Sequence, residues 1–63
     1  MTVWHHSRRG LIRGDAVGGD ETWLHIRLAV DCPRASMVAR GFGPVDEAGT
    51  VITVRRSLVR EVF

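Results

Sequence analysis

The clearest pattern along the chain is a strict alternation of hydrophobic and polar positions in residues 22–30, TWLHIRLAV. The two alternating sets are Leu24, Ile26, Leu28 and Val30 on one side, and Trp23, His25, Arg27 and Ala29 on the other. Successive side chains of a β-strand point to opposite faces, so a period of two indicates a strand with one buried face. We therefore expect a half-buried strand whose inner face is the Leu, Ile, Leu and Val set.

A weaker hydrophobic run precedes this strand. Leu11, Ile12 and Val17 predict a strand that is interrupted by Gly14. Residues 18–21, GGDE, separate the two runs, and glycine reaches positive φ without strain. Residues 11–30 are therefore predicted to form a β-hairpin whose first strand bends at Gly14, where a bulge would fit.

The second half of the chain predicts shorter elements. Pro33 breaks the alternation, because proline cannot continue a central strand. Residues 35–39 predict a short strand, and residues 41–49 predict a loop rich in turn-forming residues. Residues 50–55, TVITVR, are rich in β-branched side chains and predict a further strand. The predicted core consists of Leu24, Ile26, Leu28, Val30, Val51 or Ile52, and Val54.

The C-terminal segment leaves two alternatives open. Residues 55–63 carry both helical and strand signals. Ser57 can cap one helical turn, and Val62 and Phe63 can close a last strand. A full helix over residues 55–63 is the competing prediction.

These elements resemble, in order, those of the SH3-like β-barrel family, which includes Tudor-type and KOW-type modules. The matching segments are "GLIRGDAV", "ETWLHIRLAV", "SMVA", "TVITVRR", "SLV" and "REVF". The resemblance implies a mainly β fold: a small five-stranded SH3-like barrel with one short helical turn near the C-terminus. It divides the chain into an N-terminal arm or strand at residues 1–9 and a single barrel domain at residues 10–63. Members of this family are mostly non-catalytic and bind protein, DNA or RNA.

Length and composition narrow the class of protein. A chain of 63 residues makes one small domain that buries only about 60% of its unfolded surface, so a partner chain would add stability. Cys32 is the sole cysteine, which excludes an internal disulfide. No segment resembles a signal peptide or a membrane helix, so we expect a cytoplasmic protein. All nine basic residues are arginine, which fits the GC-rich genome of a bacterium or a phage.

The sequence gives little indication of a metal site or of a catalytic site. His5 and His6 are adjacent, so in a strand they face opposite sides and cannot chelate one ion together. His25, Asp31 and Cys32 add possible ligands without any recognised zinc spacing. The serines have no histidine base placed beside them by the sequence. We therefore expect no enzyme activity, no metal and no cofactor.

The arginines form the candidate site. Two groups lie far apart in the chain: Arg8, Arg9 and Arg13, and then Arg55, Arg56 and Arg60. The first and last strands of the resembled barrel are neighbours, so the two groups would merge into one basic patch. Such a patch is what binding to phosphate backbones requires, and Trp4 and Trp23 could stack on bases. A solvated charged surface is the plain alternative.

Trp23 favours a second hypothesis, because it falls on the face opposite Leu24 and Ile26. An exposed tryptophan is costly unless something covers it, either within the chain or from a second subunit. The candidate interface residues are Trp4, Trp23, His25 and Phe63. The leading hypothesis is thus a non-enzymatic, regulatory binding module that uses the arginine patch on nucleic acid. The alternative is a protein-binding module that forms a homodimer, or that inhibits or modulates a host protein, through these residues and its edge strands.

Overall fold

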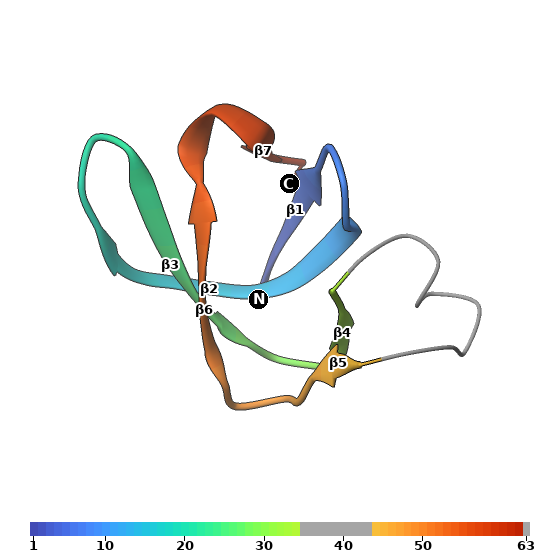
Figure 1. Ribbon diagram of the computed structural model, residues 1–63. Helices are drawn as coiled ribbons and strands as arrows, with labels where there is room; N and C mark the ends of the chain where they lie inside the picture. The colour runs from blue at the N-terminus through green and yellow to red at the C-terminus, as the bar shows by residue number, and fades with distance from the viewer. Residues whose placement is uncertain (35–43, 63) are drawn as a thin grey trace.

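The chain folds as a mainly β structure, which confirms the predicted class. The computed structural model describes residues 1–34 and 44–62 (Figure 1). Its elements are β1 (Thr2–His6), β2 (Gly10–Gly19), β3 (Trp23–Leu28), β4 (Cys32–Pro33), β5 (Val45–Asp46), β6 (Val51–Arg55), the 3-10 turn η2 (Arg56–Leu58) and β7 (Val59–Glu61). The strand predicted at residues 35–39 lies outside the described residues, as does Phe63.

Five of these strands form one antiparallel sheet in the order β6-β3-β2-β1-β7, while β4 and β5 form a separate two-stranded sheet. The N-terminal strand β1 lies inside the larger sheet, between β2 and β7 (Figure 1). Within the described residues neither sheet closes into a barrel: β6 and β7 are the two edges of the larger sheet, and η2 links them along the chain.

The C-terminal segment follows the first of its two predicted alternatives, a short helical turn and then a last strand. The turn's N-cap is Arg55 without a side-chain hydrogen bond, so the predicted cap by Ser57 is wrong, and the strand ends at Glu61, before Val62. Residues 56–58 form one short turn of 3-10 helix, and Val59–Glu61 then forms β7. The competing prediction of a full helix over residues 55–63 is wrong. The β-branched Val59 follows the turn in extended conformation and pairs with His6, so β7 extends the sheet instead.

The predicted hairpin of β2 and β3 is confirmed, but its bulge lies elsewhere. The register shifts between Ala16 and Gly18, so the bulge is at Val17 and not at Gly14. Gly14 has a different role, since a Cβ atom there would collide with the backbone carbonyl of Arg27. Glycine is therefore required at this position by the close approach of β3.

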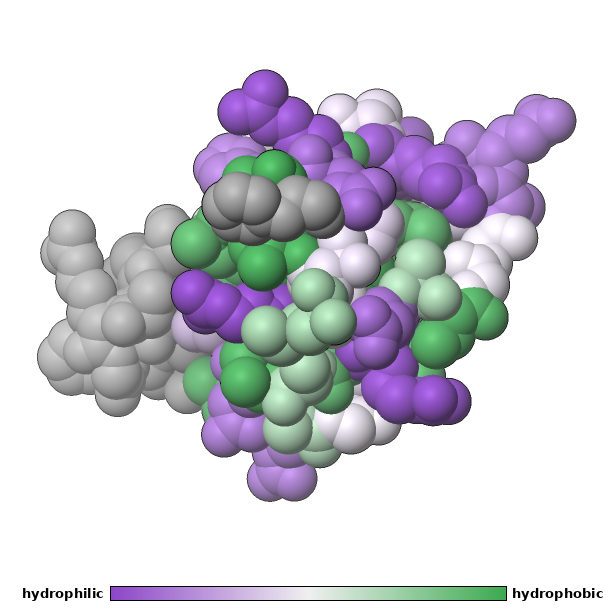
Figure 2. Space-filling model, turned by 180° about the vertical axis from the view of Figure 1, so that it is seen from behind, coloured by the Kyte–Doolittle hydropathy of each residue, from purple (hydrophilic) through white to green (hydrophobic). Residues whose placement is uncertain are grey.

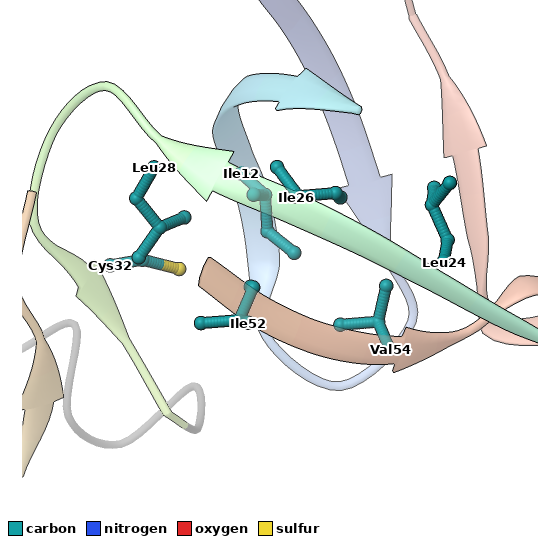
Figure 3. Close-up of a cluster of buried hydrophobic side chains, with 7 residues drawn as sticks. All are labelled: Ile12, Leu24, Ile26, Leu28, Cys32, Ile52 and Val54. Carbon is teal, nitrogen blue, oxygen red and sulfur yellow. The ribbon is translucent and has the colours of Figure 1, made fainter. Parts of the chain in front are cut away.

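The core lies on one face of the larger sheet (Figure 3). It consists of Ile12, Leu24, Ile26, Leu28, Cys32, Ile52 and Val54, with Trp4 and Val59 packed against it. Five of the predicted positions are thereby confirmed. The prediction for Val30 is wrong, because β3 ends at Leu28 and the chain bends at residues 29–30, which leaves Val30 exposed.

Candidate nucleic-acid interface

The outer face of β3 and β6 carries the most distinctive group of side chains. Leu24 and Ile26 point inward, so the alternate residues of β3 point outward, as do those of β6 that alternate with Ile52 and Val54. We define the tryptophan–arginine face by five of these outward residues: Trp23, His25, Arg27, Thr53 and Arg55. Each of the first two is directly opposite a β6 partner, because the register pairs Trp23 with Arg55 and His25 with Thr53.

Contacts between the two strands fix this face. The guanidinium carbon of Arg55 lies 5.0 Å from the centre of the Trp23 ring, within the range of a cation–π interaction. Trp23 nevertheless remains 40% exposed. Beside this pair, Nδ1 of His25 lies 2.9 Å from Oγ1 of Thr53, a hydrogen-bonding distance. The tryptophan that needed a cover is thus partly covered by an arginine of its own chain.

Positive charge dominates the two strands of this face. Neither β3 nor β6 contains an acidic residue, and the nearest acidic cross-strand neighbour is Asp15 of β2, opposite Arg27. The turn before β3 contains Asp20, whose main-chain carbonyl accepts a hydrogen bond from Nε of Arg56. The carboxylate of Asp20 accepts the amides of Trp23 and Thr22, and these bonds lower its pKa. This carboxylate therefore organises the turn that begins β3.

Arg9, one of the predicted phosphate-binding residues, is partly buried and bonded to other parts of the chain. Its guanidinium forms an ion pair with Asp46 at 2.7 Å and donates to the carbonyl oxygen of Pro33 at 3.0 Å. Its side chain is only 12% exposed. Burial raises the pKa of Asp46, but hydrogen bonds from Arg9 and Arg34 outweigh it and hold that pKa below its ordinary value. Arg9 therefore fastens the turn after β1 to the small β4–β5 sheet.

The other predicted arginines are exposed but divided between two parts of the sheet. β1 does pair with β7, which places Arg60 of β7 opposite His5 of β1. Arg13 lies on β2, opposite Val3 of β1. Arg8 follows β1 in the turn. Arg55 and Arg56, by contrast, lie at the end of β6 and the start of η2, and three strands separate β6 from β7 in the sheet order. In the described part of the chain, no side-chain hydrogen bond or ion pair joins Arg8 or Arg13 to Arg55 or Arg56.

The other predicted tryptophan has different surroundings from Trp23. Trp4 packs against the core, and its indole Nε1 donates to the carbonyl oxygen of Gly14 at 3.1 Å. This contact gives Trp4 a structural role. Phe63 lies outside the described residues. Sequence reasoning omitted Arg27 from the site, although its alternation with Ile26 and Leu28 already placed it on the outer face.

The histidines differ in exposure as their alternation predicts. His6 is buried, and its Nδ1 accepts the main-chain amides of Arg8 and Arg9 at 3.0 and 3.2 Å. Burial, followed by the charges of Arg9, Arg8 and His5, lowers the pKa of His6, so it acts as a neutral acceptor. In the described part of the chain, no group of three or more histidine, cysteine and acidic side chains could hold a metal ion.

Comparison with known proteins does not extend this description. No protein-family model, no curated protein and no solved structure matches the chain. Over residues 1–34 and 44–62, no helix has the length and apolar character needed to cross a membrane.

Proposed function

We propose that the chain is a non-enzymatic SH3-like module that binds single-stranded nucleic acid through the tryptophan–arginine face. The pairing of the first strand with the last, and the short helical turn between β6 and β7, support the SH3-like assignment. The binding proposal rests on one observation above all. An exposed tryptophan carries an arginine over its ring, on two strands without an acidic residue.

The chemistry of this face suits unpaired nucleotides. A base can stack on the Trp23 indole or on the plane of the Arg55 guanidinium, and such stacking contributes about 1–3 kcal/mol per base. Arg27 lies on the same outer face and can meet the phosphates on either side of a stacked base. His25 is held to Thr53 through Nδ1, so Nε2 is the ring nitrogen that can meet a base edge.

A salt-dependent titration tests this proposal. The fluorescence anisotropy of a labelled oligothymidylate is followed at several salt concentrations with the wild-type protein and its variants. Arg27→Gln and Arg55→Gln should each reduce the slope of log affinity against log salt by about 0.7, the value for one phosphate contact on a single strand. Trp23→Ala should weaken binding by about 1–3 kcal/mol.

Arg34→Gln is the matched control, because it removes the same charge from an exposed arginine outside this face. Its salt slope should equal that of the wild type. Absence of binding to oligothymidylate and oligouridylate at low salt would exclude the proposal, as would equal effects of Arg34→Gln and Arg55→Gln.

Binding to a protein, including a second copy of the chain, is the second candidate function. It is favoured by exposed hydrophobic side chains on the outer side of the sheet, namely Leu11, Val17 and Val51, which are 45–48% exposed. On the side drawn in Figure 2, however, hydrophobic and hydrophilic residues are interspersed. If Trp23 lies in a dimer interface, Trp23→Ala should convert dimer to monomer in analytical ultracentrifugation. A wild-type protein that sediments as a monomer at high micromolar concentration would exclude self-association.

A further inference from the structure

A second site lies away from the tryptophan–arginine face, where the end of β1, the turn η2 and the start of β7 meet. A hollow of about 270 Å³ opens there. It is lined by His5, Ser7, Ser57, Leu58, Val59 and Arg60. The amide of Ser7 donates to the carbonyl oxygen of Leu58 at 2.8 Å, which holds two of the walls together.

The lining combines groups that bind anions with an apolar surface. His5 and Arg60 are directly opposite each other across the β1–β7 pair, so their side chains lie on the same face. Ser7 and Ser57 add two hydroxyl groups, which can donate to an anionic oxygen. Leu58 and Val59 are half-buried and supply the apolar part. None of the described residues that line the hollow is acidic.

We propose that this hollow binds an organic phosphate monoester whose substituent is apolar or aromatic. The planar fork of the Arg60 guanidinium matches two phosphate oxygens, and the histidine and the serines can donate to a phosphate from other elements. Leu58 and Val59 then contact the substituent, which inorganic phosphate lacks.

This proposal is independent of the proposed function, because Trp23 and Arg55 do not line the hollow. Trp23→Ala should therefore leave binding at the hollow unchanged. If nucleic-acid binding fails while ligand binding at the hollow persists, only the proposed function is excluded.

Two-dimensional amide NMR tests the site with four probes: phenyl phosphate, inorganic phosphate, phenol and benzoate. Phenyl phosphate should give saturable shifts at the amides of residues 57–60 and of His5 and Ser7. Phenol carries only the aromatic ring of phenyl phosphate, and inorganic phosphate carries only the anion. Each should therefore bind at least about tenfold more weakly than phenyl phosphate. The planar carboxylate of benzoate should also bind more weakly than phenyl phosphate.

Variants separate a built site from general charge attraction. Arg60→Gln should weaken phenyl phosphate binding about tenfold or more, because it removes a charge-assisted hydrogen bond. Ser57→Ala should cause a smaller loss. Arg13→Gln is the matched control, with the same loss of charge on the outer face of β2, and should have no effect. The NMR spectrum of each variant also reports whether it remains folded.

Three results would overturn the proposal. These are shifts that do not saturate or that scatter over the surface, equal weakening by Arg60→Gln and Arg13→Gln, and equal affinity for benzoate and phenyl phosphate. A further arm distinguishes the source of the phosphate. If a short oligonucleotide gains affinity from a 5′-phosphate and then binds more tightly than phenyl phosphate, the ligand is a nucleic-acid end. If phenyl phosphate binds more tightly than that oligonucleotide, the ligand is a small molecule.

Discussion

Two regions of this small protein are held together by different forces. The β3–β6 pair packs through apolar side chains such as Leu24, Ile26 and Val54, all of which are buried (Figure 3). The corner where the turn after β1 meets β4 and β5 depends on polar contacts, with Arg9 bonded to Asp46 and to the carbonyl oxygen of Pro33. The inner face of the first region is apolar, while the second region is held by a partly buried ion pair.

This difference predicts how each region tolerates change. Apolar burial is non-directional, so stability in the β3–β6 pair depends on volume and on the exclusion of water. A partly buried ion pair is directional, and the loss of one partner leaves the other charge with less compensation. Substitution should therefore act through cavity size in the first region and through unmatched polar groups in the second.

The largest effect should come from Ile26→Ala. Ile26 is fully buried at the centre of the core, and its truncation should lower the free energy of unfolding by about 2–5 kcal/mol. Such a loss is comparable to the whole stability of a small domain. Urea denaturation followed by circular dichroism measures it. Val51→Ala, on the exposed side of β6, is the control and should change stability by no more than about 0.5 kcal/mol.

Arg9→Ala should have the next largest effect and should define the polar corner. It removes the shorter of two ion pairs to Asp46 and the hydrogen bond to Pro33, at an expected cost of about 1–3 kcal/mol. Arg34→Ala is a matched control on the same carboxylate. Because the Arg34 side chain is 57% exposed, its loss should cost at most about 1 kcal/mol. Equal thermal stabilities of the two variants would refute the structural role of Arg9.

The two regions also differ in how far the sequence predicted them. The strict alternation in residues 22–30 predicted β3 and its buried side chains, because burial on one face imposes a period of two. That pattern failed at Val30, where a bend ended the strand. The pairing of Arg9 with Asp46 joins residues 37 apart in sequence and has no local pattern, so it emerged only from the fold.

The candidate site shows the same limit. Alternation predicted that Trp23, His25 and Arg27 share the outer face, and it thereby predicted half of the site. The position of Arg55 over Trp23 depends on the register between β3 and β6. Neither strand's own sequence specifies that register. The six arginines were grouped by the neighbouring first and last strands of the resembled barrel. That reasoning could not separate Arg9, which is partly buried, from the arginines that are exposed.

Acid should destabilise the protein in two steps. The pKa of His6 is lowered in the folded state, so the unfolded chain binds a proton first as the pH falls below about 6.5. Stability should then fall from that pH down to the lowered pKa of His6, by at most about 1.4 kcal/mol per pH unit for one proton. Asp46 has a lowered pKa as well, so its contribution should be lost only below about 3.8.

Urea denaturation of wild type and of His6→Asn, from about pH 7.5 down to about pH 5, isolates the first step. The asparagine oxygen can replace Nδ1 as the acceptor for the turn amides but does not titrate. His5 and His25 are present in both proteins, so the difference between the two curves reports His6 alone. Curves that remain parallel over this range would contradict the prediction.

Arg55→Gln should have the smallest effect on stability and the clearest effect on function. Its contact with Trp23 lies on the outer side of the well-packed β3–β6 pair, where an exposed cation–π interaction contributes about 0.5–1 kcal/mol. The free energy of unfolding should therefore fall by no more than that, whereas the salt slope for oligothymidylate should fall by about 0.7. Arg55→Lys should keep the slope, because it keeps the charge, but should lose stacking by the planar guanidinium. A large loss of stability in Arg55→Gln would mean that Arg55, like Arg9, serves the fold, and that the outer face is not available for a ligand.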